Sequence, residues 1–525
     1  MVSLAVVLVA SVFARQMDRV ASTDPAQCQS VYDSKVIQLI YETPLNIDYY
    51  ARPYKLVPGA CELPEVSADG LTYIFRLREK CGSRSVELGV KDVKDFEDSA
   101  TPHSTLLAPS SYDIVRSLER LRDPEIVSPN GWYLKSVDTI KALDDKTVEI
   151  RMKRRQHVFP WIMAMSGCGI MKEDGSGTGP FELTKWWKNH EMVFTRRRSL
   201  TANSQQLTAN ASRGFDEVRF LVIDDMSTQW LMFLNGELDV LGEISQDNWD
   251  AVVDKDGNLS PDLVKAGVKM YSMPTLSVMY IGLNMKDPVL GNNKKLRQAL
   301  NAAFDFEAWN RFYCNRAEEA GGPLPPTVSS ALPADTFRYR FNLELAKKLI
   351  AEAGYPDGID PNTGRRLVLT VSMGRASQDA RERAELMASF YEKIGVKLET
   401  KFYTWDAFLK AVNEGRTQMY QMGWVGDYPD AENFLQLFHS SNVSPGANHS
   451  CYVNPEYDRA YDAAMAASTT EERNRYWREC QEIVREDCPW IYTHVPKSNS
   501  LVRPSVGNYI PSDFPYGQEA YLESK

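Results

Sequence analysis

Two kinds of hydrophobic pattern divide the chain. In residues 66–78, VSADGLTYIFRLR, apolar side chains occupy every second position after an Asp-Gly turn, which predicts a turn and a strand. Residues 137–152 and 177–197 show β-type patterns on both sides of a turn and predict hairpins. Residues 110–122 instead space their apolar side chains as a helix does. The first half of the chain is therefore predicted to be rich in β-structure.

The second half alternates between helical and strand patterns. Residues 276–285, LSVMYIGLNM, form a continuous apolar run, which is typical of a strand buried on both faces. Further strands are predicted at 367–373, 396–403 and 488–496, and helices at 226–235, 294–313, 341–358, 379–395, 404–415, 455–467 and 471–486. This strand–helix rhythm predicts an open α/β lobe with partly parallel strands.

Length and charge narrow the class of protein. The chain has 525 residues, 43% of them hydrophobic, and a net charge of −10. A single hydrophobic core stops growing near ~250–300 residues, so more than one domain is expected. An acidic surface repels phosphate backbones, and we therefore expect no nucleic-acid partner.

The N-terminus carries an apolar segment, Leu4–Ala14, in which Val12-Phe13-Ala14 is similar to a signal-peptidase site. The run is too short for a transmembrane helix, which needs about 20 apolar residues. It also lacks the positively charged start of a secretory signal. We predict that residues 1–22 form a signal peptide whose start lies upstream; the alternatives are a short anchor or an ordinary apolar segment.

Cysteine and histidine spacing gives no indication of a metal site or cofactor. The eight cysteines include no C-x-x-C pair, and the six histidines are scattered. An exported chain can form disulfides, and a Cys61–Cys81 bridge is one candidate because it would close a strand pair. The pairing cannot be deduced from the sequence.

Several segments, taken in order, resemble the extracellular solute-binding proteins of family five, which serve peptide-type ABC transporters. Each segment alone is weakly specific, but their order along nearly the whole chain is specific. The segments are VSADGLTYIFRLR, GTGPFELTKW, YIGLNMKDPVLGNNKKLRQALNAAFDFEAW, GGPLPP, FNLELAKKLIAEAGYPDG, QMGWVGDYPDAENF and NPEYDRAYDAAMAASTTEERNRYWRECQEIVREDCPWIYTH.

The resemblance implies an α/β fold of the periplasmic-binding-protein type (type II, cluster C), with two lobes joined by a two-strand hinge and closing on ligand. It places the crossings near Tyr280–Asn284 and Tyr492–Ser500. The expected domains are lobe I at 23–280 with an accessory subdomain at about 66–190, lobe II at 281–492, and a C-terminal return at 493–525.

The resemblance also assigns ligand contacts in QMGWVGDYPDAENF. The Asp of its W-x-x-D pattern is Asp427, which would pair with a ligand amine, and Trp424 would form an aromatic wall. Main-chain groups of Gly423, Trp424 and Val425 would bind the ligand backbone as an added strand. The alternative is that Asp427 only shapes a turn, and Asp430 is expected to be a helix N-cap.

Other candidate contacts depend on position alone. Arg375 stands where dipeptide-binding relatives hold a ligand carboxylate, although a solvated arginine at a strand end would look the same. Trp405 would line the second lobe or belong to its core. Ser30, Tyr32 and Asp33 lie where the family's early loop faces the ligand.

The predicted function is non-catalytic. As an exported, periplasmic and monomeric protein, it would capture di- or oligopeptides by hinge closure and deliver them to an ABC transporter permease. The alternatives are another solute, such as an oligosaccharide, a metal chelate or haem, or a role as a sensory receptor subunit. Asp427 and Asp430 do not predict an enzyme, because no nucleophile–histidine arrangement accompanies them.

Two segments depart from the family pattern, ELGVKDVKDFEDSATPHSTLLAPSSYDIV after FRLREKC and TRRRSLTANSQQLTANASRGFDEV after the GTGPF hairpin. Both fall in the predicted first lobe. They leave ligand size and first-lobe contacts open.

Overall fold

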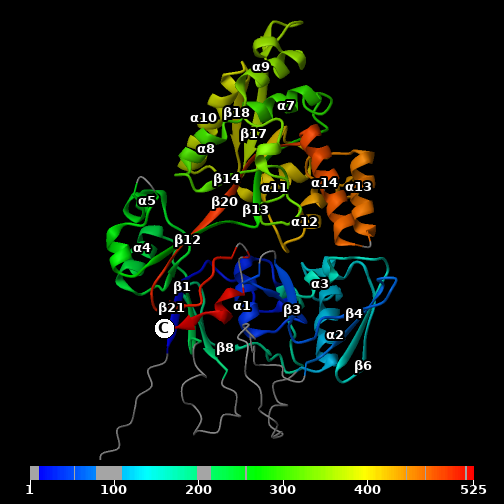
Figure 1. Cartoon of the computed structure of the whole chain (residues 1–525), viewed down its shortest axis with the longest axis vertical. Coiled ribbons are helices and arrows are strands. Elements are labelled where there is room, and N and C mark those ends of the chain that lie inside the picture. The colour runs from blue at the N-terminus through cyan, green and yellow to red at the C-terminus, as the bar shows by residue number, and fades with distance from the viewer. Residues whose placement is uncertain are drawn as a thin grey trace, which may run out of the picture. The chain divides into compact units, whose positions relative to one another are not determined.

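The structure is a computed structural model (Figure 1). It describes residues 11–51, 54–78, 109–197, 214–254, 257–444, 446–467, 469–512, 514 and 517–525, without the side chains of 246, 247 and 406. The chain forms two compact units, which we call unit 1 (residues 1–272 and 499–525) and unit 2 (residues 273–498).

Unit 1 is built on a mixed sheet in the order β11 (Val240–Leu241), β1 (Val12–Gln16), β10 (Glu217–Leu221), β9 (Glu191–Arg196) and β8 (Phe181–Trp187). β1 runs parallel to β10 and to β11, whereas β9 is antiparallel to its neighbours β10 and β8. The helix α1 (Val31–Ile40) contributes to the same core, in which Phe13, Val36 and Phe181 are fully buried. The predicted hairpin at 177–197 is therefore confirmed as β8–β9.

The strand β1 includes part of the N-terminal apolar segment. Each residue from Val12 to Gln16 pairs in register with β10, and Phe13 is inaccessible to solvent. Val12-Phe13-Ala14 is thus part of the main sheet. The signal peptide at residues 1–22 stays a prediction, since apolar character fits both a buried strand and a signal segment.

A cleavage experiment tests the assignment of β1. If the chain is cleaved near its N-terminus, we expect the cleavage to lie before Val12, because cleavage after Ala14 would remove Val12–Ala14 from a strand that pairs with β10 and β11. N-terminal sequencing or intact-mass measurement of the purified protein identifies the end. A mature chain that starts at Arg15 would contradict the assignment of β1.

A separate four-stranded antiparallel sheet lies in the predicted accessory region. Its order is β4 (Glu65–Val66), β5 (Thr72–Arg76), β7 (Thr147–Met152) and β6 (Val137–Asp144). The helix α2 (Ser111–Glu119) contacts β6 and starts with a capping box formed by Ser110 and Asp113. The predicted hairpin at 137–152 and helix at 110–122 are confirmed. The sheet ends at Met152, whereas residues 181–196 of the predicted subdomain belong to the main sheet.

The remaining elements of unit 1 are short. They are β2 (Leu45–Asp48), β3 (Lys55–Pro58), α3 (Phe159–Ile162), α4 (Met226–Asn235), α5 (Gln246–Val252), α6 (Pro261–Lys265), β21 (Val506–Gly507) and β22 (Glu523–Ser524). The predicted end of α4 at Asn235-Gly236 is confirmed, since Gly236 takes the left-handed conformation at the helix terminus.

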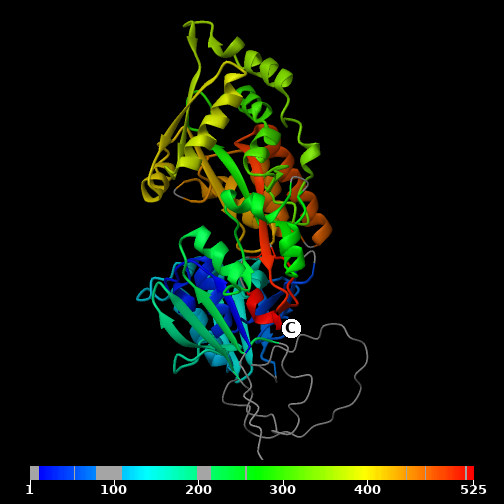
Figure 2. The same cartoon turned by 90° about the vertical axis from the view of Figure 1, so that its left-hand side faces the viewer.

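Unit 2 has an α/β sheet in the order β18 (Lys397–Phe402), β17 (Val368–Met373), β19 (Met419–Val425), β13 (Ser277–Leu283) and β20 (Trp490–Val502). β17 is parallel to both β18 and β19, and β13 is antiparallel to β19 and β20. Figures 1 and 2 show helices on both faces of these strands. The partly parallel α/β arrangement predicted from the sequence is confirmed.

The elements around this sheet follow the predicted pattern closely. They are α7 (Lys294–Ala303), α8 (Phe306–Phe312), β14 (Ala317–Glu319), α9 (Leu343–Glu352), β15 (Ile359–Asp360), β16 (Arg365–Arg366), α10 (Gln378–Glu392), α11 (Trp405–Asn413), α12 (Ala431–Leu435), α13 (Pro455–Ala466) and α14 (Thr470–Asp487). The single helix predicted at 294–313 is wrong. Asp305 caps a new helix by accepting a hydrogen bond from the Ala308 amide, so α7 and α8 are separate.

The two boundaries between the units fall inside neighbouring strands. The first lies between Ser272 and Met273 in β12 (Lys269–Pro274), and the second between Ser498 and Asn499 in β20. β12 and β20 pair with each other. These boundaries differ from the predicted ones at 280 and 492. The reason is that β13 pairs with β19 over its whole length, which assigns it to unit 2.

The described residues were searched for membrane-spanning helices and for paired cysteines. Among the described residues, no helix is both long and apolar enough to cross a membrane. Cys61 is buried, but Cys81 lies outside the described residues, so the bridge between them stays a prediction. The thiols of Cys28, Cys168, Cys314, Cys451, Cys480 and Cys488 are free.

Candidate functional site

The predicted ligand residues of the second half gather at one edge of the sheet in unit 2. Arg375 follows β17, Trp405 follows β18 as the first residue of α11, and Asp427 follows β19. Since β17 runs parallel to both neighbours, the carboxyl ends of all three strands meet at the same edge. In open α/β sheets, this edge is where ligands bind.

The end of β19 has a free side. β17 pairs with β19 only at Met419 and Tyr420, whereas β13 pairs with β19 from Met419 to Val425. In the part of the chain that the structure describes, no strand pairs with residues 421–425 on the side of β17. The end of β19 can therefore accept an added strand.

The alternation of main-chain directions shows which residues face this free side. The Gly426 amide donates to the Leu276 carbonyl at 2.7 Å, so Gly426 points its main chain toward the side of β13. Residues of an antiparallel pair alternate in direction, which gives Trp424 the same direction and gives Gly423 and Val425 the opposite one. Of the three predicted main-chain contacts, Gly423 and Val425 face the free side, and the main chain of Trp424 is used by β13.

Two glycines allow close packing at this end of β19. A Cβ atom on Gly423 would lie 2.3 Å from Met279 Sδ, so a larger residue would displace that side chain. A Cβ atom on Gly426 would lie 2.8 Å from Leu276 Cγ and 2.9 Å from Phe434 Cζ. Gly426 therefore lets the turn after β19 pack against α12, which brings Asp427 to that helix.

Asn433 of α12 connects the aromatic and acidic residues of the site. Its Oδ1 accepts hydrogen bonds from Trp424 Nε1 at 2.9 Å and from the Asp427 amide at 3.1 Å. Its Nδ2 donates to Asp427 Oδ2 at 3.1 Å. Asn433 has no exposed surface. We did not identify it from the sequence, where an Asn in the first turns of a helix is an ordinary capping residue.

The Asp427 carboxyl is largely removed from solvent. Burial raises its pKa above the ordinary value for an aspartate, and the hydrogen bond from Asn433 lowers it in part. A carboxylate in such surroundings gains from pairing with a cation, because partial burial removes the water that would otherwise stabilise its charge.

Asp430 and Glu432 have structural partners. Asp430 caps α12 by accepting from the Glu432 amide, as predicted, and it forms an ion pair with Arg473 of α14 at 2.7 Å. Glu432 accepts hydrogen bonds from the hydroxyls of Tyr428 and Tyr461. Burial raises the pKa of Glu432 above its ordinary value. Asp430 therefore caps α12 and pairs with Arg473, whereas Glu432 binds two tyrosine hydroxyls.

Arg375 and Trp405 lie at the surface of unit 2. Arg375 is exposed, and among the described residues no carboxylate is within ion-pair distance of it. Trp405 is 53% exposed, so it does not belong to the core, and it packs against Phe408 with ring centroids 5.6 Å apart. A Cβ atom on Gly374 would lie 2.7 Å from the Trp405 ring, which places the indole beside the residue that precedes Arg375.

The early residues of unit 1 are mostly structural. Asp33 is fully buried, and its carboxylate accepts from the amides of Ala21, Gln29 and Ser30. Ser30 caps α1 in a capping box with Asp33. Both side chains therefore serve the start of α1, and a ligand contact by Ser30 or Asp33 stays a prediction. Tyr32 is partly buried against the core of unit 1 and keeps some exposed surface.

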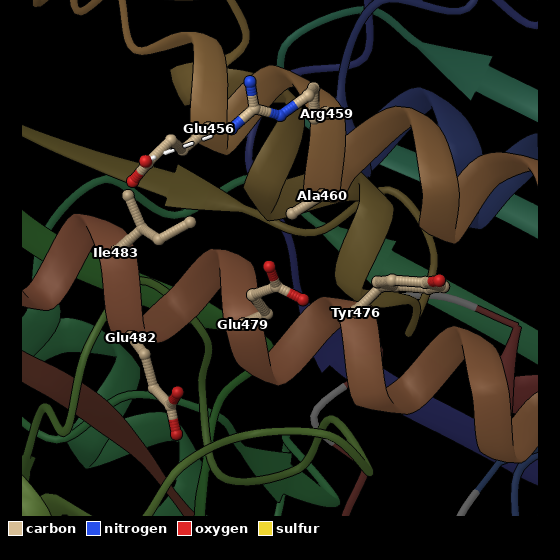
Figure 3. A pocket seen from close by; sticks show the side chains of 7 residues that line it. All are labelled: Glu456, Arg459, Ala460, Tyr476, Glu479, Glu482 and Ile483. Carbon is tan, nitrogen blue, oxygen red and sulfur yellow. Dashed lines mark ion pairs between the residues drawn. The ribbon is translucent and has the colours of Figure 1, made fainter.

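A concave surface of unit 2 contains none of the predicted residues. A groove of about 420 Å³ runs between α13 and α14 and is lined by Glu456, Arg459, Ala460, Tyr476, Glu479, Glu482 and Ile483 (Figure 3). Glu456 and Arg459 form an ion pair at 3.9 Å. No group of His, Cys, Asp and Glu residues in the described ranges is arranged to hold a metal ion.

Comparison with known proteins gives an independent result. Residues 108–446 match the sequence model of the bacterial extracellular solute-binding proteins, family 5. The heme-binding protein A of Haemophilus influenzae is 27% identical, over 88% of this chain and 83% of its own. The dipeptide-binding protein of Escherichia coli is 23% identical, over 92% of this chain and 88% of its own.

Solved structures show the same architecture. The structure of HbpA2 from Haemophilus parasuis aligns with a TM-score of 0.78 at 23% sequence identity, and the alignment covers 98% of this chain and 99% of the other. At that level of identity the likeness establishes the fold, which is the two-lobe periplasmic binding-protein fold expected from the sequence.

Proposed function

Since this chain belongs to the bacterial extracellular solute-binding proteins, family 5, it is a binding protein and not an enzyme, and we propose that its solute is a short peptide. The peptide pairs with the free side of β19. The observation that carries this proposal is the arrangement of Gly423 and Val425 on an unpaired strand side, with Arg375 after the end of β17 and Asp427 after the end of β19.

Charge at the two ends of this stretch defines how the peptide lies. Asp427 pairs with the α-amino group, and Arg375 holds the α-carboxylate through its planar guanidinium. With its amine at Asp427 and its carboxylate toward β17, the peptide runs antiparallel to β19. Main-chain hydrogen bonds to Gly423 and Val425 bind the peptide whatever its side chains are.

The length of the site favours small peptides. From Gly423 to Asp427, an extended chain measures roughly 13 Å at about 3.3 Å per residue, and the Arg375 side chain shortens this span further. Peptides of about two to four residues match this length. Trp424 and Trp405 supply apolar surface beside the peptide.

The cellular role follows from the family. Members are exported binding proteins that serve ABC transporters. We propose that this protein is a periplasmic monomer that captures peptides by hinge closure and delivers them to a permease. The same loaded form could signal through a receptor, and transport of a labelled peptide separates the two roles.

Calorimetry and mass spectrometry test the ligand class. We expect denaturation of the purified protein to release short peptides, and we expect alanyl-leucine to bind with a micromolar or lower Kd. Its C-terminal amide should bind at least tenfold more weakly, since the amide cannot pair with a guanidinium. In the Arg375→Gln variant this difference should disappear. Release of sugars or a metal chelate without peptides would replace the proposal.

Haem is a second candidate, and one specific observation favours it. The relative with 27% identity over 88% of this chain is named a heme-binding protein. Haem iron needs a His, Cys, Met or Tyr ligand, which leaves a clear absorbance signature on binding. Titration with haemin decides between the candidates: saturable haemin binding that alanyl-leucine does not displace would support haem over peptide.

A further inference from the structure

Asn433 occupies a position that packing alone does not explain. A fully buried amide is costly unless its polar atoms are bonded, and here both of its side-chain polar atoms have partners in the same small region. All three partners belong to Trp424 and Asp427, which are the aromatic and acidic residues of the proposed ligand site. The side chain therefore connects the two functional groups directly.

The direction of these bonds fixes the orientation of the amide. An amide oxygen accepts and an amide nitrogen donates. The indole N–H of Trp424 and the main-chain N–H of Asp427 both require an acceptor, so the oxygen of Asn433 must face them. The nitrogen is then turned toward Asp427 Oδ2, where only a donor stabilises a negative charge.

We propose that Asn433 is the positioning residue of the ligand site, which holds the Asp427 carboxylate ionised and oriented for a ligand amine and locks the Trp424 indole beside it. The inference rests on the proposed function of Asp427. It extends that function by naming the group that keeps a partly buried aspartate charged in the absence of ligand.

Two neighbouring carboxylates have partners of their own. On α12 and α14, Asp430 is held by Arg473 in an ion pair at 2.7 Å. Glu432 is held by the hydroxyls of Tyr428 and Tyr461. Burial raises the pKa of Asp427, and the hydrogen bond from Asn433 lowers it in part.

The test is the pH dependence of alanyl-leucine affinity, measured by calorimetry between about pH 4.5 and 7, where the ligand keeps both of its charges. In the Asn433→Ser variant the short hydroxyl no longer bonds Asp427 Oδ2. The pH at which affinity falls to half should move upward by about one unit.

The Asn448→Ser variant is the control, because Asn448 is equally buried and its side-chain nitrogen donates to the main-chain carbonyls of His439 and Tyr452. The Asn448→Ser variant should lower the unfolding free energy without moving the pH at which alanyl-leucine affinity falls to half.

A milder variant keeps the test decisive if Asn433→Ser does not fold. Trp424→Phe keeps an aromatic wall but removes the indole N–H that orients the amide. The midpoint should then shift in the same direction by a few tenths of a pH unit. An unchanged midpoint in the folded variants would overturn the role of Asn433. If Asp427→Asn itself left alanyl-leucine affinity unchanged at pH 7, the proposed function of Asp427 would fail instead.

Discussion

Replacing Asp427 by Asn is expected to weaken the binding of alanyl-leucine by about ten- to a hundredfold. A hydrogen bond to a charged group contributes about 1.5–3 kcal/mol, and each 1.4 kcal/mol corresponds to about tenfold in Kd. Asparagine has nearly the same shape and can still accept the hydrogen bond from Asn433. The loss of affinity therefore reports the loss of charge. Isothermal titration calorimetry at pH 7 measures it.

The pH profile provides a second readout of the same variant. Only ionised Asp427 pairs with an amine, so wild-type affinity should fall as the pH drops through the raised pKa of this carboxyl, at a pH above the ordinary range for aspartate. The ligand amine stays protonated throughout this range. Affinity of the Asp427→Asn variant should be independent of pH in the same range.

Stability serves as the control for folding. A carboxyl whose pKa is raised in the folded state loses stabilising free energy as the pH rises from the unfolded pKa to the folded pKa. Removing its charge should therefore leave the unfolding temperature at pH 7 unchanged or slightly higher. The neighbouring Asp430→Asn variant keeps a good helix cap and should bind alanyl-leucine normally. Equal losses of affinity in both variants would contradict the assignment to Asp427.

The second large effect concerns the core of unit 2. Trp490 is 2% exposed, and its ring stacks on Tyr280 with centroids 3.4 Å apart and an interplanar angle of 3°. Phe438 covers it from another direction, with centroids 4.4 Å apart. Tyr280 and Trp490 belong to the paired strands β13 and β20. Trp490→Ala should lower the unfolding free energy by about 3–5 kcal/mol, since it leaves a cavity between these strands.

Urea unfolding followed by far-ultraviolet circular dichroism measures this loss, because the removal of a tryptophan would disturb a fluorescence signal. The Trp187→Ala variant is the control. Trp187 is 58% exposed, and surface substitutions usually change stability by less than about 0.5 kcal/mol. A loss below about 1 kcal/mol for Trp490→Ala would show that β13 and β20 do not depend on the stacked pair.

Local signals predicted most of the secondary structure. The helix at 110–122, the hairpin at 137–152 and the cap at Asp430 each depend on groups a few residues apart, and each appears where the sequence predicts it. The error at residues 294–313 is also local. An apolar helical pattern continues past Asp305, but the aspartate side chain accepts from the Ala308 amide and starts a new helix there.

The N-terminal segment shows where local signals fail. Apolar residues from Leu4 to Ala14 fit a signal segment, whereas the structure uses Val12–Gln16 as a strand between β10 and β11. These partners lie some two hundred residues away in the chain, at Glu217–Leu221 and Val240–Leu241. No property of the segment itself indicates them.

Residue types and spacing alone thus determined the α/β composition, most helix and strand positions and the cap at Asp430, and the family resemblance supplied Asp427 as a candidate ligand contact. Only the tertiary structure decided that β17 stops pairing at Tyr420, that Gly423 and Val425 face the free side of β19, and that Asn433 bonds both Trp424 and Asp427. The physical reason is the range of the interactions. Caps and turns form between neighbours in sequence, whereas strand register and buried hydrogen bonds depend on segments that meet only after folding.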